Sequence, residues 1–407
     1  YFMKISTLLN REPFPKLFEK TMILFLDDLY GLNHSVKWSN KFNSAEFFDK
    51  SEFWYCNPAI NSVFVKNANP TIFNSINGEY SYNPIRPWRS LLQKIYLFFS
   101  QTKLTSVLLA SHKIYISPPI DDSKNKLIIG GNTKIRLIDI SQKKVYVILK
   151  DGFDKKYINK EIYARNNFPY LPIPKITELG NNNLWYCEEY VIGTPPNRIL
   201  KNKRNTIITS AVRDIHKMLN ETKKHISINK YVSTLNEQIN LHLKSPVFAG
   251  TDIKKKILNI SNLITEFIIK DPHEFITTAY CHGDLHEGNI LSNGEEYWIL
   301  DWENSGQNQI CYDLFLLLIG SRIEKILKIN FFKILNNDLD DEQLKLINNW
   351  PEVNLSKINT RKVYLIIFLL EDLIFHIDEK NNDVFYKAPL TLSNRCSEIQ
   401  LILDEIL

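Results

Sequence analysis

The residues best suited to carry out chemistry lie close together in the last third of the chain. His282, Asp284 and Asn289 occur within one short segment, and Asp301 follows soon after it. Two short apolar runs, beginning at Asn289 and at Tyr297, flank a turn-like Ser-Asn-Gly-Glu sequence and predict a β-hairpin. Because a hairpin brings its two ends together, we expect Asp284 and Asn289 to lie near Asp301.

Two carboxylates and a carboxamide at one place suit a hard cation that carries phosphate. Mg²⁺ keeps several of its waters and takes one or two carboxylates from a protein, so few protein ligands are expected. A remaining carboxylate could orient an attacking hydroxyl and accept its proton as phosphate is transferred. The segment therefore predicts Mg²⁺-dependent phosphoryl transfer.

The same segment resembles the aminoglycoside phosphotransferase and choline kinase group, whose relatives are the protein kinases. The catalytic-loop pattern of that group is His-x-Asp, four residues and Asn, and His282, Asp284 and Asn289 match it. The metal-binding aspartate of the group follows an apolar strand, as Asp301 does. A later Tyr-Asp-Leu that opens a helix in the group is matched at Asp313.

The resemblance implies a role for each of these residues. Asp284 would be the catalytic base, and Asn289 and Asp301 would hold Mg²⁺. Asp313 would brace the catalytic loop, and His282 would hold the backbone of the loop. The phosphate donor would be ATP or GTP.

A lysine that binds phosphate is predicted upstream. The expected strand 145–149 ends in Lys150, whose ammonium group could reach between phosphates as a point charge. Glu161 lies in an expected helix over 156–166, and the resemblance implies an ion pair between Lys150 and Glu161. An exposed lysine at a strand end and a solvated helix glutamate are the alternatives.

Two further stretches would complete the nucleotide site. Gly130 and Gly131 fall where these families place a phosphate-covering loop, and glycine permits close approach of an anion to the backbone. A hairpin turn with two glycines would have the same sequence. Glu189 and Val191 lie in a segment that resembles the linker beside the adenine, which backbone groups recognise.

The acceptor is expected to be a hydroxyl of a small molecule or a glycan. Gly283 stands where protein kinases have arginine, and only residues 303–308 precede the next helix, so a long regulatory loop is not expected. Glu371 and Asp372, on an expected helix over 361–377, could attract an acceptor that carries an amine. Alternatively they form the polar face of an amphipathic helix.

Two other functions stay open at this point. The chain could be a catalytically silent nucleotide-binding pseudokinase that serves as a partner module. It could also be a metal-dependent hydrolase that uses His282, Asp284 and His286, although a zinc site of that kind needs further ligands at recognisable spacing.

The composition fits a globular protein that binds a polyanion such as ATP. The net charge is +5 over 407 residues, and we expect no nucleic acid partner. Five scattered cysteines favour a reducing compartment, and no apolar run is long enough to cross a bilayer. We therefore expect a cytoplasmic protein, with its oligomeric state left open.

The N-terminal region leaves a peripheral membrane contact open. Pro87 could begin a helix in which Leu91, Ile95, Phe98 and Leu109 follow helical spacing. Three cations accompany this stripe: Arg89, Lys94 and Lys103. Such a stripe could lie on a membrane, or it could pack against the rest of the protein.

Strands followed mostly by helices predict an α+β protein. The resemblance implies a two-lobed, protein-kinase-like fold, with an antiparallel-sheet nucleotide lobe over 121–193 and a mainly helical lobe over 194–407. The helical lobe would hold the catalytic loop and the acceptor pocket. Residues 1–120 would form an additional N-terminal region whose role the sequence does not indicate.

Overall fold

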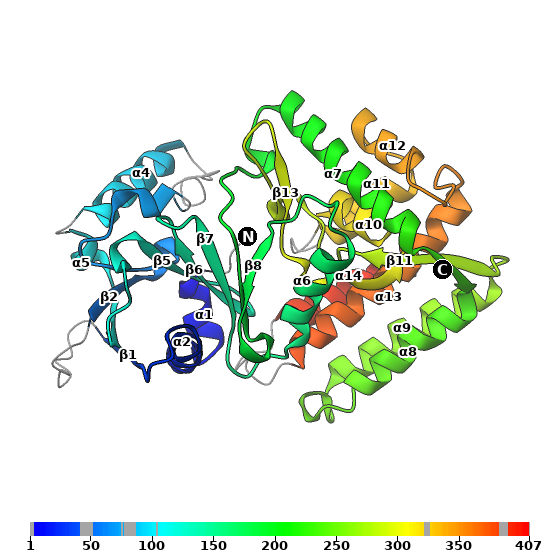
Figure 1. Ribbon diagram of the computed structural model, residues 1–407. Coiled ribbons are helices and arrows are strands. Elements are labelled where there is room, and N and C mark those ends of the chain that lie inside the picture. Colours follow the sequence, from blue (N-terminus) through cyan, green and yellow to red (C-terminus); the bar gives the residue numbers. More distant parts are fainter. Residues whose placement is uncertain are drawn as a thin grey trace. The chain divides into compact units, whose positions relative to one another are not determined.

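The computed structural model describes residues 4–40, 52–74, 76, 87–102, 105–320, 326–381 and 390–406. They form two compact units. One comprises residues 1–198 and 291–300 and is called the sheet unit; the other comprises 199–290 and 301–407 and is called the helical unit. The predicted α+β organisation, with one antiparallel-sheet part and one mainly helical part, is confirmed (Figure 1).

The sheet unit is built on a nine-stranded sheet in the order β1-β4-β2-β3-β5-β6-β7-β9-β8, and neighbouring strands are antiparallel. The strand predicted over 145–149 and the helix predicted over 156–166 agree with the structure to within about two residues, as β7 (Lys144–Leu149) and α6 (Lys156–Asn167). The neighbouring strands are β5 (Lys126–Gly130), β6 (Lys134–Asp139) and β9 (Trp185–Glu189). The edge strand β8 (Ile176–Leu179) completes this part of the sheet.

The N-terminal region extends the same sheet. Its strands are β1 (Ser35–Asn40), β2 (Glu52–Asn57), β3 (Ser62–Val65) and β4 (His112–Ser117). Val63 of β3 lies opposite Ile128 of β5, so the hydrogen-bonded sheet continues from one region into the other. Two further helices of this region are α4 (Pro87–Gln101) and α5 (Thr105–Leu109).

Helices α1 (Ile5–Arg11) and α2 (Phe14–Tyr30) cover one face of the sheet. Phe25 of α2 packs edge-on against Trp185 of β9, with ring centroids 5.5 Å apart. The core beneath the helices also includes Ile135 of β6 and Ile148 of β7, which lie opposite each other in the sheet. Burial of these aromatic and aliphatic side chains binds the N-terminal region to the predicted nucleotide lobe.

Helix α6 lies on the opposite face of the sheet from α1 and α2. Side chains along a strand alternate between the two faces, and residues paired across strands share a face. Ile135 and Ile148 point toward α1 and α2, so Lys134 and Leu149, which also pair, point the other way. Glu161 of α6 binds the Lys134 side chain there.

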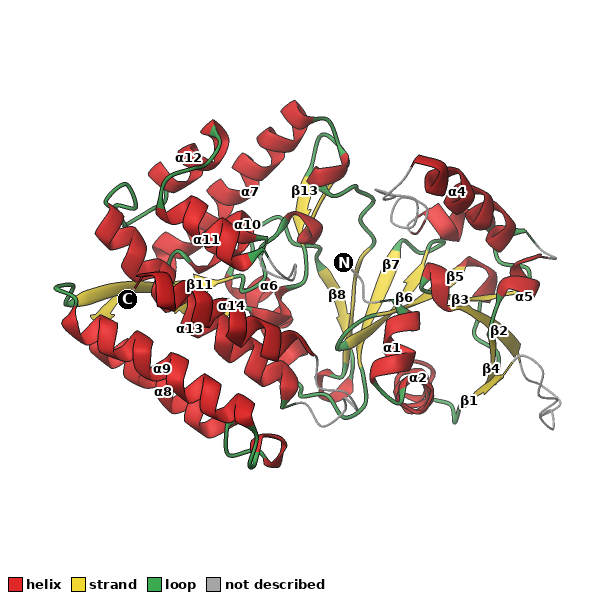
Figure 2. Ribbon diagram, turned by 180° about the vertical axis from the view of Figure 1, so that it is seen from behind, coloured by secondary structure: helices red, strands yellow, loops and turns green. Residues whose placement is uncertain are grey.

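The helical unit contains eight helices among its described residues, with a three-stranded sheet beside them (Figure 2). The helices are α7 (Lys201–Thr222), α8 (Ile228–His242), α9 (Asp252–Lys270), α10 (Tyr312–Ile319), α11 (Leu327–Leu335), α12 (Asp341–Asn348), α13 (Ile358–Lys380) and α14 (Leu390–Ile406). The strands are β10 (Lys224–Ser227), β11 (Phe275–Cys281) and β14 (Gly306–Gln309). The middle of α13 is buried all round its circumference, as expected for a core helix.

The predicted hairpin is present as β12 (Ile290–Ser292) and β13 (Tyr297–Ile299), which pair in a two-stranded sheet. Thr194 of the segment after β9 exchanges two backbone hydrogen bonds with Ser292, of 2.8 and 3.0 Å. A Cβ at Gly193 would lie only 2.9 Å from the Ser292 nitrogen. Glycine therefore allows this segment to pack closely on the hairpin.

Within the described residues, no helix combines the length and the apolar character needed to span a membrane.

Candidate active site

The loop after β11 is fixed by a buried aspartate in the first turn of α10. The carboxylate of Asp313 accepts hydrogen bonds from the backbone N–H groups of His282 (2.7 Å) and Gly283 (2.9 Å). Burial raises the pKa of the Asp313 carboxyl, and the nearby His282 ring and the two N–H groups oppose that rise. Asp313 thus attaches the loop to α10 at two consecutive residues.

His282 uses its ring to order the backbone. Its Nδ1 accepts a hydrogen bond from the Asp284 N–H at 3.1 Å. The fully buried ring lies against Trp302, with centroids 4.5 Å apart. The ring therefore fixes the loop immediately before Asp284.

Gly283 occupies a position that excludes any side chain. Its φ is +80°, and a Cβ there would lie 2.1 Å from the carbonyl oxygen of Asn304. The close approach of the two backbone segments gives a physical reason for the absence of the arginine found here in protein kinases.

Asp284 and Asn289 are joined directly. The Nδ2 group of Asn289 donates to the Asp284 carbonyl oxygen at 2.9 Å and to its Oδ2 at 3.0 Å. Both residues are buried, with Asp284 4% exposed and Asn289 5% exposed. Nε2 of His286 lies 3.7 Å from Asp284 Oδ1. The buried carboxylate is thus held by Asn289 through Oδ2, and its Oδ1 faces the His286 ring.

Asp301 has an unusual backbone conformation. Its φ and ψ are +65° and +61°, in the left-handed region that residues other than glycine seldom adopt. It stands two residues after the end of β13, and Asn289 directly precedes β12, so the pairing of these two strands brings their flanking residues to the same end of the hairpin. Outliers of this kind are concentrated at functional sites.

The chemistry of these donors fits Mg²⁺. All the candidate ligand atoms are oxygens, which this cation prefers. Both hydrogen bonds of Asn289 use its amide nitrogen, so its carboxamide oxygen is the atom suited to ligate a metal. The side-chain oxygens of Asn289 and Asp301, the two residues expected to hold the ion, are therefore chemically suited to Mg²⁺.

The metal-hydrolase alternative has no support in the structure. Nδ1 of His282 is used on the Asp284 N–H, and Nδ1 of His286 accepts from the Gly288 N–H at 3.0 Å. Among the residues that the structure describes, no group of three or more His, Cys, Asp or Glu side chains is arranged to hold a metal.

Lys150 forms a buried ion pair with a residue that sequence analysis did not find. Its Nζ lies 2.5 Å from Oε1 of Glu12, and both side chains are fully buried. Burial raises the pKa of the Glu12 carboxyl, against the effect of Lys150. The two residues are 138 positions apart, so no local pattern indicated the pair.

Glu161 is bound by two other cations. Its carboxylate accepts from Lys134 Nζ at 2.7 Å and from Arg165 Nη1 at 2.6 Å. Arg165 also reaches Glu188 at 2.5 Å. Lys134 and Glu161 are 2% and 1% exposed, so this ion pair is shielded from solvent. The ion pair between Lys150 and Glu161 stays a prediction.

Gly130 and Gly131 are explained by close packing. A Cβ at Gly130 would lie 2.8 Å from Ile5 and 3.0 Å from Leu8, both in α1. A Cβ at Gly131 would lie 2.6 Å from the Lys134 carbonyl oxygen. The turn therefore requires glycine for structural reasons, and its phosphate-covering role stays a prediction.

Glu189 ends β9 opposite Lys144, and its N–H donates to the Lys175 carbonyl at 3.1 Å. Val191 follows β9 and is partly buried. Both residues lie in the sheet unit, and their place beside a nucleotide base stays a prediction.

A comparison with protein families identifies the segment that contains the catalytic loop. Residues 185–372 match the family model of choline/ethanolamine kinase. The resemblance to the choline kinase group is confirmed. The predicted enzyme class, a kinase that acts on a hydroxyl acceptor, is confirmed with it. The match begins in β9, after β5, β6, β7 and α6, so it does not reach the candidate phosphate-binding lysines.

The chain is also similar to several solved structures, at low sequence identity. A choline/ethanolamine kinase family protein from Mesorhizobium loti is 15% identical, with a TM-score of 0.45 over 68% of this chain and 87% of that one. The aminoglycoside phosphotransferase APH(4)-Ia is 13% identical, with a TM-score of 0.46 over 69% and 94%. Choline kinase from Streptococcus pneumoniae is 12% identical, with a TM-score of 0.40 over 70% and 92%. No curated protein matches the chain in sequence.

The two acids proposed for acceptor binding lie in the core of this choline-kinase-like segment. Glu371 Oε1 accepts hydrogen bonds from the Tyr231 hydroxyl and from the Gln309 N–H. Asp372 accepts from Arg395 at 2.6 and 3.0 Å. Neither acid lies on an exposed polar face of α13, and an acceptor contact through either one stays a prediction.

Glu371 predicts a pH dependence of stability. Burial raises the pKa of its carboxyl to about 8, although hydrogen bonds from Tyr231 and Gln309 oppose the shift. Between the ordinary value of 4.5 and about 8, the folded protein keeps a proton that the unfolded chain has lost. The free energy of unfolding therefore falls as pH rises through this window. We expect the Tm of Glu371→Gln to fall less steeply than that of the wild type between these pH values.

Thermal unfolding followed by circular dichroism at several pH values would measure this effect. Glu295→Gln, at an exposed residue of the hairpin turn, is the control and should follow the wild type. An unchanged slope in Glu371→Gln would contradict the assignment.

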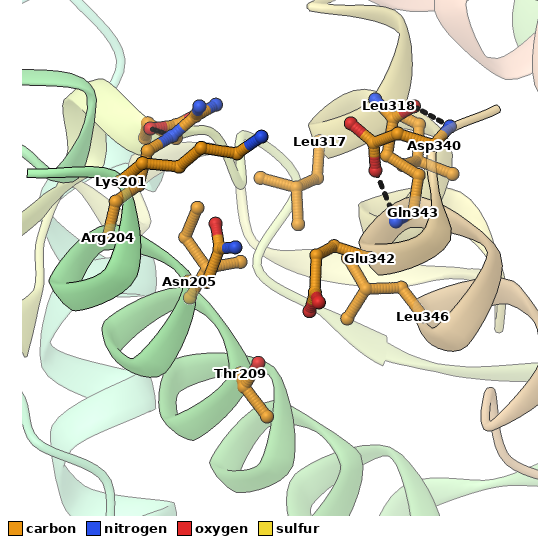
Figure 3. A pocket seen from close by; sticks show the side chains of 12 residues that line it. Lys201, Arg204, Asn205, Thr209, Leu317, Leu318, Asp340, Glu342, Gln343 and Leu346 are labelled. Atoms are coloured by element: carbon orange, nitrogen blue, oxygen red, sulfur yellow. Dashed lines mark hydrogen bonds and ion pairs between the residues drawn. The ribbon is translucent and has the colours of Figure 1, made fainter.

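Sequence analysis also missed a cavity in the helical unit next to the catalytic loop. Glu287, three residues after Asp284, lines it and binds Arg204 of α7 with its carboxylate. Figure 3 shows Lys201 reaching into the space from α7 and the carboxylate of Glu342 pointing toward α7 from α12. Apolar side chains complete the wall: Ile208, Leu317, Leu318 and Leu346. The walls thus offer both charged and apolar contacts to a small molecule.

Proposed function

We propose that this protein is an ATP- and Mg²⁺-dependent phosphotransferase that moves the γ-phosphate to a hydroxyl of a small molecule, with Asp284 as the base. GTP is the alternative donor. The observation that supports this most is the buried contact between Asp284 and Asn289 in a loop attached to Asp313. A carboxylate fixed in this way suits a group that must meet one hydroxyl in one orientation.

The proposed mechanism assigns a role to each of the three residues Asp284, Asn289 and Asp301. Asp284 orients the acceptor hydroxyl and takes its proton, while the Asn289 amide keeps the carboxylate in place. Asn289, through its carboxamide oxygen, and Asp301 would hold the metal. Bound Mg²⁺ supplies positive charge to the phosphate oxygens.

We infer that Lys134, rather than Lys150, is the lysine that meets the phosphates of the donor. Lys134 lies beside the Gly130-Gly131 turn, on the face covered by α6, and Glu161 of α6 directs its ammonium group. Lys150 lies toward the other face, in a fully buried pair with Glu12. An ammonium group held by a helix carboxylate is suited to phosphate because its direction is fixed before the nucleotide binds.

The family match and the cavity of Figure 3 support amino alcohols as the acceptor class. Choline and ethanolamine carry a hydroxyl and a cation on a short chain, and the carboxylate of Glu342 at the cavity suits a cation. Amino alcohols are therefore the first acceptors to test. Sugars and aminoglycosides, which also offer hydroxyl groups, come next.

The test is a panel of these acceptors with labelled ATP, with and without Mg²⁺. Transfer of label to one acceptor class that stops when EDTA removes the metal is the expected result. Tight ATP binding without transfer to any acceptor would instead indicate a silent nucleotide-binding module.

A further inference from the structure

Helix α4 exposes a continuous apolar stripe. Trp88, Leu91, Leu92, Ile95, Phe98 and Phe99 are between 43% and 66% exposed. They recur at intervals of three and four residues, which places them on one side of the helix. Leu108 of the adjacent α5 is 69% exposed and extends the stripe. These residues are called the α4 apolar face.

The opposite side of α4 attaches the helix to the sheet unit. Leu97 is 6% exposed and Ser100 is fully buried. The Tyr96 hydroxyl donates to Asn57 Oδ1 at 3.1 Å, and Asn57 Nδ2 donates to Ser100 at 3.3 Å. Because Asn57 ends β2, the apolar face is held outward by the sheet itself.

Exposed apolar side chains are ordinary when they are scattered, but a contiguous set usually marks a binding surface. Leu92, Ile95 and Phe99 line a shallow groove with Leu108 of α5, and its walls are almost entirely apolar. The free energy falls when such a surface leaves water and enters another apolar phase.

The charge pattern of the sequence that contains α4 indicates what that phase is. The chain has no Asp or Glu between Glu79 and Asp121. Five cations fall in the same interval: Arg86, Arg89, Lys94, Lys103 and Lys113. Lys94 is exposed on α4 itself. A basic amphipathic helix with Trp and Phe on its apolar side is typical of segments that lie in the interface of an anionic membrane.

We propose that the α4 apolar face binds the surface of a membrane that contains anionic lipids, with α4 lying parallel to that surface. The apolar side chains enter the boundary between headgroups and acyl chains, and the exposed Lys94 meets lipid phosphates. A second copy of this chain would bring the same excess of positive charge against itself, which disfavours self-association through this face.

Co-sedimentation of the full chain with vesicles tests the proposal. We expect binding to phosphatidylcholine vesicles with about 30% phosphatidylserine, weaker binding to phosphatidylcholine alone, and loss of binding as salt rises. The double change Phe98→Ser and Phe99→Ser should weaken binding at least about tenfold, because two exposed rings no longer leave water. Lys94→Glu should weaken binding only to the anionic vesicles.

Ile269→Ser is the matched control, because Ile269 is 64% exposed but belongs to the helical unit. Its binding should equal that of the wild type. Absence of binding to either vesicle, or equal binding by the Phe98 and Phe99 variant, would overturn the proposal. So would a dimer in sedimentation equilibrium that this variant dissociates, because the face would then join two copies. Unchanged thermal unfolding of the variant shows that any loss of binding is local.

Discussion

Asp284→Ala should lower kcat by about 100- to 10,000-fold, the usual range for removal of a general base. The acceptor hydroxyl would then lose the group that orients it and takes its proton. In the proposed mechanism Asp284 contacts the acceptor and not the donor. The affinity for ATP without acceptor should therefore change by less than about tenfold. Steady-state kinetics with the best acceptor and calorimetric titration with ATP would measure both quantities.

The substitution also removes an acceptor of the Asn289 amide, which is buried. The bond from Asn289 to the backbone carbonyl of residue 284 remains, so one N–H of the amide loses its acceptor. A buried N–H left unsatisfied costs about 1–3 kcal/mol, so thermal unfolding must accompany the kinetics. Glu295→Ala in the exposed hairpin turn is the matched control and should keep full activity. Full turnover by a folded Asp284→Ala protein would remove Asp284 as the base and leave the mechanism without support.

The hairpin and its flanking acids could be predicted from the sequence because their signals are local. A turn, two short apolar runs and the spacing from His282 to Asn289 are all visible within 20 or so residues. The strands β5, β6 and β7 were predictable for the same reason, since apolar runs and turns define them within a few positions.

Contacts between distant segments could not be predicted in this way. Nothing near Glu12 or Lys150 indicates that they meet, and the four N-terminal strands join the sheet through pairings such as Val63 with Ile128. Glu371 belongs to a helix whose apolar residues surround it, so its neighbours Tyr231 and Gln309 come from other parts of the fold. Tertiary packing, rather than local pattern, decides each of these positions.

Tertiary structure also distinguishes Lys134 from Lys150 as the phosphate-binding lysine. In sequence, Lys150 stands at the end of an apolar strand and Lys134 at the start of the strand before it, and both suit phosphate equally. The strand register separates them. Lys134 pairs with Leu149 and shares its face, so Lys150, the next residue, points toward α1 and α2.

Lys134→Met should therefore reduce kcat/KM for ATP by about 100-fold or more, the usual loss when a fixed charge on the phosphates is removed. The fold should tolerate this change better than most changes to buried charges, because Glu161 keeps its ion pair with Arg165. Kinetics with varied ATP concentration, together with thermal unfolding, would separate the effect on activity from an effect on stability.

Lys150→Met alone should unfold the sheet unit more readily, because it leaves the fully buried carboxylate of Glu12 without this cation. Breaking a buried ion pair from one side costs about 3–5 kcal/mol, whereas replacing both partners by apolar residues is often neutral. The double variant Glu12→Met with Lys150→Met should recover stability and, if Lys134 meets the phosphates, should keep kcat/KM for ATP within about threefold of the wild type. A double variant that unfolds like the wild type but no longer uses ATP would show that Lys150 is the phosphate-binding lysine and that the Glu12 pair must open before the nucleotide binds.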